Sequence, residues 1–236
     1  MPLMKSTMIR TEPISTSLTI KVDRTPKNHE QADAIESTWQ DLCAQNPRYF
    51  NGQMLAFDSY DPATGVIRAS IEEYKNHAVR DTVDVGIYLL ATTAIITAPD
   101  EQGEPRYVLG QRSPSTHQYG NRWELGPSGG VDVPADGTDH LEFDAIVNEL
   151  KREIIEEVGI EIGACPAAPI ALVHDDAVGS VDIAIQITLP AMPVLDCSWE
   201  YVDCRWIPLA ELLDWVTKRP NELIPTTVAL ALRLNT

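Results

Sequence analysis

The chain has 236 residues, of which 44% are hydrophobic and 22% charged, enough for one sizeable core and a smaller appendage. Its formal net charge of −17 argues against nonspecific binding to nucleic acid and to an anionic membrane surface. We recognise no secretory signal and no membrane-spanning stretch. The four cysteines lack metal-type spacing, so we expect reduced thiols in a cytoplasmic protein.

The first third of the chain predicts a leader, a helix and a β-hairpin. Apolar positions recur at helical spacing over residues 30–45, and Asn46-Pro47 is a stop signal. Two runs with strand composition then flank the turn formers of residues 61–65, which predicts the hairpin. We take residues 1–16 as a loose leader and residues 1–82 as a small N-terminal α+β subdomain.

Residues 83–236 predict a second domain in which strands surround one central helix. Short apolar runs bounded by turn formers predict strands at 85–97, 107–112, 123–125, 169–173, 181–189 and 201–207. Helical patterns cover residues 144–158, 208–217 and 225–234. This order of elements predicts an α/β sandwich with a mixed sheet.

The most informative stretch is residues 152–160, Arg-Glu-Ile-Ile-Glu-Glu-Val-Gly-Ile. Helix geometry places Glu153, Glu156 and Glu157 on one arc of about 100°, away from the apolar stripe. Gly159 follows as the left-handed residue that ends the helix. Three like charges in a last turn oppose the helix dipole, and a hard divalent cation is the simplest offset. The alternative is a solvated acidic face.

This stretch resembles the second half of the Nudix box, Gly-x5-Glu-x7-Arg-Glu-U-x-Glu-Glu-x-Gly-U, where U is aliphatic. The first half departs: Asp144 stands at the family's glutamate position, and residues 131–143 form a longer loop after Gly130. Asp144 is also a candidate helix N-cap. The segment from Trp123 to Gly130 resembles the family's Trp-x-x-Pro-Gly-Gly segment. The resemblance implies a Nudix-type α/β/α sandwich over about residues 83–217.

The same resemblance implies a chemistry and its residues. Nudix enzymes hydrolyse a nucleoside diphosphate linked to another moiety by water attack at phosphorus, with Mg²⁺ (Mn²⁺ as the alternative). Carried over, the metal ligands are Glu153, Glu156, Glu157 and the carbonyl of Gly130. Arg152 would orient a glutamate, with Glu156 one turn away, and Glu153 or Glu157 would activate the water. Because ligands must be deprotonated, we expect activity to rise toward alkaline pH.

Three further residues are candidate substrate-binding residues, each with a structural alternative. Arg112 suits a substrate phosphate or is a surface arginine. Trp123 could stack on a base or sugar, or belong to the core. Glu200 lies where the family often supplies a further acidic residue, or is a loop carboxylate. For residues 174–176, His-Asp-Asp, we favour a solvated loop.

The substrate and partners rest on a shorter resemblance. Trp39 and residues 46–52 resemble the leading segment of a Nudix subgroup that acts on UDP-sugars, which favours a nucleotide sugar; the alternative is no role in specificity. We expect a small-molecule diphosphate as partner, no nucleic acid and no membrane, and leave a homodimer open. The altered first half of the box motivates a second reading, a non-catalytic Nudix-fold nucleotide-binding or sensing module. An isomerase of prenyl diphosphates ranks low, because it would want a catalytic cysteine beside the substrate, whereas Cys43 precedes the core domain and the other three cysteines follow the box.

Overall fold

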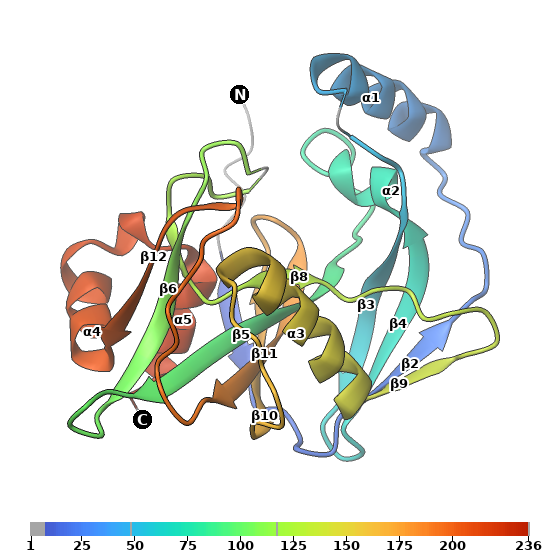
Figure 1. Ribbon diagram of the computed structural model, residues 1–236. Helices are drawn as coiled ribbons and strands as arrows, with labels where there is room; N and C mark the ends of the chain where they lie inside the picture. Colours follow the sequence, from blue (N-terminus) through green and yellow to red (C-terminus); the bar gives the residue numbers. More distant parts are fainter. Residues whose placement is uncertain (1–7, 48, 117, 236) are drawn as a thin grey trace.

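One large mixed β-sheet organises the chain (Figure 1). The structure is a computed structural model that describes residues 8–47, 49–116 and 118–235. Within these ranges a 12-stranded sheet carries helices on both sides. The expected α/β class with a mixed sheet is confirmed.

The strands run in the spatial order β1-β10-β11-β5-β3-β4-β2-β9, with β6 joining β5, β7 and β12, and β8 pairing with β5. Two pairs, β11 with β5 and β2 with β4, are parallel, and the others are antiparallel. The strand bounds are β1 Ile9–Glu12, β2 Thr19–Asp23, β3 Gln53–Asp61, β4 Val66–Glu73, β5 Leu89–Pro99, β6 Pro105–Arg112, β7 Trp123–Leu125, β8 Ser128–Gly130, β9 His140–Glu142, β10 Ala167–Asp175, β11 Ser180–Thr188 and β12 Tyr201–Pro208.

The helices divide between the two faces because strand residues alternate between them. Alternate residues of β5, Leu90, Ala94 and Ile96, share one hydrophobic cluster with α3. The intervening Ile95 belongs to a second cluster with α4 and α5. The helix bounds are α1 Ala32–Gln45, α2 Tyr74–Ala78, α3 Phe143–Val158, α4 Leu209–Lys218 and α5 Pro225–Leu234, with a 3₁₀ turn, η1, at Pro220–Glu222.

The central helix α3 forms for the reasons that its sequence indicates. Its apolar stripe is buried against the sheet, including Ile146, Leu150 and Ile154, which are all 0% exposed. Gly159 adopts φ 68° and ends the helix, as expected. The N-cap is Glu142 and not Asp144, which lies in the first turn, where a carboxylate still favours the helix dipole.

The N-terminal segment continues the main sheet. β9, inside the long loop before α3, pairs with β2, and Ile20 belongs to the hydrophobic cluster of α3. β1 pairs with β10, so the expectation of a loose leader is wrong for residues 9–12; residues 1–7 lie outside the described ranges. A domain boundary at residue 82 stays a prediction.

The cysteine expectation needs a correction. Cys197 and Cys204 form a disulfide, with their Cα atoms 6.1 Å apart, whereas Cys43 and Cys165 are free. The expectation failed because the loop before β12 folds back on that strand, which cysteine spacing alone does not reveal. In the described part of the chain, no helix is long and apolar enough to cross a membrane.

Candidate active site

The last turn of α3 places its three glutamates at different depths. Glu157 is 5% exposed, Glu153 is half-buried and Glu156 is exposed. Backbone amides of the loop before β12 meet the end of this helix: Asp196 N–H donates to the carbonyl of Val158 at 3.0 Å, and Ser198 N–H donates to that of Glu157 at 2.9 Å. This loop therefore satisfies carbonyls that a helix end leaves without partners and brings Glu200 close to α3.

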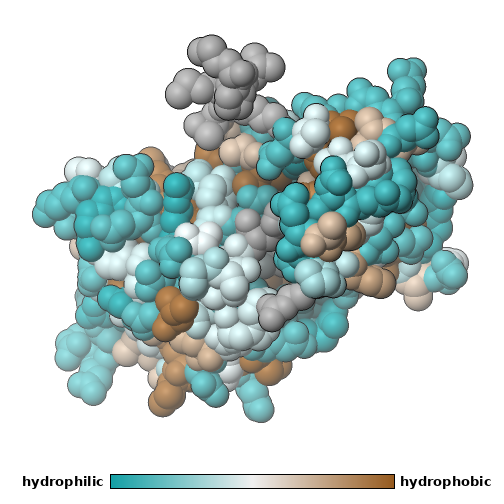
Figure 2. Space-filling model, turned by 90° about the horizontal axis from the view of Figure 1, so that it is seen from above, coloured by the Kyte–Doolittle hydropathy of each residue, from teal (hydrophilic) through white to brown (hydrophobic). Residues whose placement is uncertain are grey.

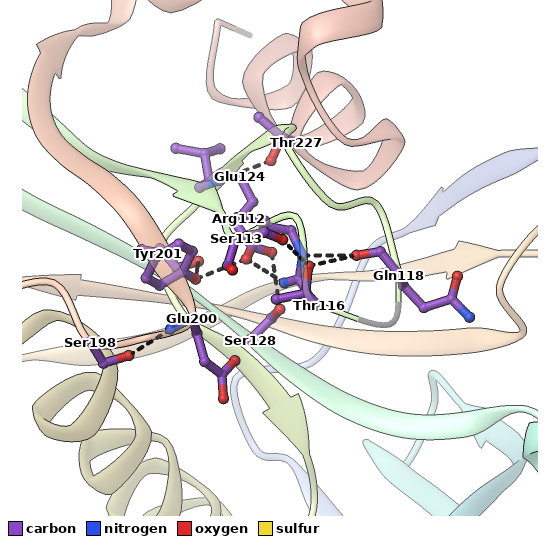
Figure 3. A network of polar contacts seen from close by, with 12 residues as sticks. Arg112, Ser113, Thr116, Gln118, Glu124, Ser128, Ser198, Glu200, Tyr201 and Thr227 are labelled. Carbon is purple, nitrogen blue, oxygen red and sulfur yellow. Dashed lines mark hydrogen bonds and ion pairs between the residues drawn. The ribbon is translucent and has the colours of Figure 1, made fainter. Parts of the chain in front are cut away.

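Arg112 and Glu124 form a buried ion pair (Figure 3), and the charge of Glu124 acts on Glu157 of α3. Glu124 is 1% exposed and accepts from Arg112 Nη1 at 2.5 Å. It also accepts from the Tyr201 hydroxyl at 2.8 Å and, on its other oxygen, from Ser128 Oγ at 3.1 Å. In Figure 3 the carboxylate of Glu200 points away from this pair. Arg112, a predicted phosphate ligand, thus has a buried carboxylate as its partner.

The glutamates of α3 and their neighbours form one electrostatic group. Burial, and then the charges of Glu200 and Glu124, raise the pKa of Glu157 to about 9. Burial, and then the charge of Glu156, raise the pKa of Glu153. Burial also raises the pKa of Glu200 against the lowering effect of Arg112. Carboxylates whose pKa values are raised by burial and by neighbouring charges are common at functional sites.

The glycine pair of β8 lets the strand pass close to these carboxylates. A Cβ atom on Gly129 would lie 3.4 Å from the carboxyl carbon of Glu153. Hydrogen bonds to β5 join residue 131 with Leu90 and Pro127 with Ala94, so the alternation of an antiparallel ladder puts Gly130 at a non-bonded position. The carbonyl of the exposed Gly130 is therefore not used by β5.

A hard divalent cation fits this set of donors. The carboxylates of Glu153, Glu157 and Glu200 and the carbonyl of Gly130 are all oxygen donors, which Mg²⁺ prefers. Three of them are carboxylates whose burial opposes their ionised form, and a cation would favour that form. Among the described residues, no three His, Cys, Asp or Glu side chains converge closely enough to hold a metal ion as they stand.

Arg152 and Trp123 contact residues other than those that their predicted roles involve. Arg152 is exposed and pairs with Asp132 of the long loop at 2.9 Å, so the expected contact with Glu156 is replaced by one with the loop. Trp123 is 6% exposed and meets Trp215 edge-on, with 5.5 Å between ring centroids. The guanidinium of Arg205 lies over the Trp123 ring at 4.3 Å. This placement favours the core alternative for Trp123.

Sequence reasoning missed the buried acids on the other face of the sheet. His174 and Asp175 are 5% and 1% exposed at the end of β10, so the expectation of a solvated loop is wrong for them. Asp175 accepts from the Tyr119 hydroxyl at 2.6 Å. With Glu124 and Asp182 it lines a cavity of about 210 Å³ that reaches Gly129 and Gly130. Strand alternation at Asp182, between apolar neighbours, was the available signal.

The N-terminal stretch that resembles a UDP-sugar subgroup has structural partners. Trp39 packs edge-on against Tyr49 and Tyr74, with centroids 5.6 and 6.2 Å away. The Asn51 side chain accepts from the amide of Lys75 at 2.9 Å, at the start of α2. Arg48 lies outside the described residues. These contacts account for part of the stretch without a substrate.

Solved structures similar to this chain are found by comparing the folds. No protein-family model matches the sequence, and no curated protein matches it. A Nudix hydrolase from M. smegmatis, RenU, matches with 20% identity and a TM-score of 0.45, covering 63% of this chain and 86% of that one. The NUDIX domain of Shewanella oneidensis NrtR, complexed with ADP ribose, matches with 18% identity, the same coverages and a TM-score of 0.45. A C. elegans Ap4A hydrolase has 17% identity, coverages of 62% and 95%, and a TM-score of 0.43.

Proposed function

We propose that this protein is a Nudix hydrolase that cleaves the diphosphate of a nucleoside diphosphate linked to another moiety, with Mg²⁺ as cofactor. The observation that carries the proposal is the electrostatic coupling of Glu153, Glu157 and Glu200, with Glu153 lying against Gly129 of the glycine strand β8. The intact motif of residues 152–160 supplies two of these carboxylates from one helix turn.

In the proposed reaction each residue has a limited task. A divalent cation, when bound, would supply positive charge that neutralises the diphosphate and makes the attacking water more acidic. Glu153, Glu157, Glu200 and the Gly130 carbonyl would hold that cation. Either Glu153 or Glu157 accepts the proton of the attacking water, whose oxygen bonds to phosphorus as the bridging P–O bond breaks. Glu156 would complete the ligand set from the exposed side of α3.

The surroundings of the carboxylates support a positioning mechanism. The Arg112–Glu124 pair and Tyr201 hold β6, β7 and β12 together beside the site. The ion pair between Arg152 and Asp132 joins the long loop to α3. Phosphoryl transfer depends on such positioning and on charge stabilisation more than on covalent catalysis. We retain a nucleotide sugar as the favoured substrate, on the N-terminal resemblance alone.

A panel of diphosphate substrates tests the proposal. Nucleotide sugars, ADP-ribose and dinucleoside polyphosphates are incubated with Mg²⁺, and released monophosphate is measured for the wild type, Glu153→Gln and Glu157→Gln. We expect turnover by the wild type and a loss of about 100-fold or more in each variant, as for removal of other catalytic charge-stabilising groups. Glu101→Gln, an exposed glutamate in the β5–β6 turn, is the matched control. Variants that retain wild-type activity would refute the assignment.

A binding-only role is the second candidate. It is favoured by the altered first half of the box. Calorimetry distinguishes the two: a nucleotide that binds with Mg²⁺ but yields no product after long incubation supports the sensing module, whereas product formation supports the enzyme.

A further inference from the structure

Trp199 is an exposed tryptophan in the loop whose backbone is bonded to the end of α3. It is 70% exposed, whereas Trp39, Trp123 and Trp215 are at most 9% exposed. A tryptophan has a large apolar surface, and leaving it in water forgoes the stabilisation that burial normally brings. One exposed apolar residue is not unusual by itself, so the inference depends on where this one lies.

The backbone on either side of Trp199 is fixed to the candidate active site. On one side, the amide of Ser198 donates to the carbonyl of Glu157 at 2.9 Å. On the other, the carbonyl of Glu200 accepts from the amide of Ser113 at 2.6 Å. Adjacent Cα atoms are about 3.8 Å apart, so the ring starts within one residue of both anchors. Its attachment to α3 and β6 is therefore short and constrained.

The chemistry around Trp199 selects the part of a substrate that it can bind. Glu200, its sequence neighbour, interacts electrostatically with Glu153 and Glu157. This acidic surface repels free phosphate, so the phosphates of a substrate need the cation. An uncharged aromatic ring has no such need, and it gains from stacking on an indole face. The occupant that fits is the nucleobase carried on the nucleoside diphosphate.

Trp123, the tryptophan that sequence reasoning selected, is less suited to this task. Its ring belongs to the cluster under α4 and α5, and Arg205 lies over it. Trp199 keeps an accessible surface and lies in the turn before β12, which a backbone hydrogen bond from Ser198 joins to the end of α3.

We propose that Trp199 is a substrate-positioning residue that stacks on the nucleobase and so sets a preference for nucleotide-linked diphosphates over diphosphates without a base. This inference rests on the proposed function for the reaction and adds the class of group recognised beside it.

Steady-state kinetics of Trp199→Ala and Trp199→Phe test the inference, each with a nucleotide-linked diphosphate and with a ribose-linked diphosphate that has no base. Stacking contributes about 1–3 kcal/mol per base, and about 1.4 kcal/mol is tenfold in binding. We expect Trp199→Ala to raise KM about tenfold for the base-bearing substrate, with kcat nearly unchanged and no effect on the base-free one. Trp199→Phe should retain most of the affinity. Val202→Ala, at a residue 58% exposed on β12, is the control.

Two kinetic outcomes would overturn the inference. One is an unchanged KM in Trp199→Ala; the other is an equal loss with both substrates, which indicates a structural role. Sedimentation adds a check: if the wild type is a dimer and Trp199→Ala a monomer, Trp199 covers a subunit interface instead.

If no substrate is hydrolysed, the proposed function fails separately. Quenching of tryptophan fluorescence by a nucleotide then decides: quenching in the wild type that is lost in Trp199→Phe supports stacking, and equal quenching overturns it.

Discussion

Tyr201 donates a hydrogen bond of 2.8 Å to Glu124, and both side chains are almost fully buried. Tyr201 begins β12 and Glu124 lies in β7, on either side of β6. The bond therefore joins two strands that do not pair with each other, directly beside the carboxylates of α3. Its removal tests whether this buried pair supports the candidate site.

Tyr201→Phe should destabilise the protein and leave the fold intact. The change removes one of the donors to buried Glu124, and the loss of a buried hydrogen bond to a charged group costs about 1–3 kcal/mol. For a chain of this size that corresponds to a fall in Tm of roughly 2–12 °C. Thermal unfolding measures it, with Tyr107→Phe, a buried tyrosine in β6, as the control. Equal Tm values for the two variants would show that the bond contributes nothing.

Arg112 and Glu124 should be strongly coupled. Arg112→Met leaves a buried carboxylate without its cation, which costs about 3–5 kcal/mol. The double variant Arg112→Met/Glu124→Met removes both charges and should recover part of that loss. Denaturant unfolding of the four proteins gives the coupling energy. Additive losses would mean that the ion pair is not an energetic unit.

The acidity of Asp182 predicts a pH dependence of stability. Burial, and then the charge of Asp175, raise the pKa of Asp182 to about 7 from an ordinary value of 3.8. The folded state then binds more protons than the unfolded state, so the free energy of unfolding should fall as pH rises from about 4 to about 7. Asp182→Asn should flatten this slope. Urea titrations at several pH values provide the measurement, and an unchanged slope in the variant would contradict the shift.

Mg²⁺ should stabilise the protein, increasingly so toward alkaline pH. In the metal-free protein the raised pKa of Glu157 favours its protonated form below about pH 9, and a cation competes with that proton. Free Mg²⁺ at 100 times its Kd raises the free energy of unfolding by about 2.7 kcal/mol, which corresponds to a rise in Tm of roughly 5–10 °C. Scanning calorimetry with Mg²⁺ and with EDTA, at pH 6 and 8.5, measures the difference. Glu157→Gln should lose most of it, whereas Glu101→Gln should behave as the wild type.

The helix that carries the candidate site could be predicted from the sequence because its information is local. The apolar stripe, the three glutamates and Gly159 all lie within one helix, and observed α3 begins one residue from the expected start. The partners of that helix could not be predicted in the same way. The burial of Glu124 depends on Arg112, twelve residues earlier in the sequence, and on Tyr201, from a distant strand.

Short or isolated signals explain the remaining differences. β9 has three residues, too few for a strand pattern, and its pairing with β2 is long-range. The position of a tryptophan beside a motif does not indicate whether its side chain is buried. The sequence therefore favours Trp123 over Trp199 as the stacking residue, although Trp123 is 6% exposed and Trp199 is 70% exposed. Figure 2 shows a face of the protein on which hydrophilic residues predominate.

The pairing of β9 with β2 has a practical consequence for work on this protein. The strand that leads directly into α3 is held by residues near the start of the chain. A fragment cut after residue 82 would lose that partner and expose a bare strand edge, which invites pairing between molecules. We expect such a truncated fragment to self-associate, so a minimal version trimmed to the motif-bearing portion would be a poor substitute for the intact chain.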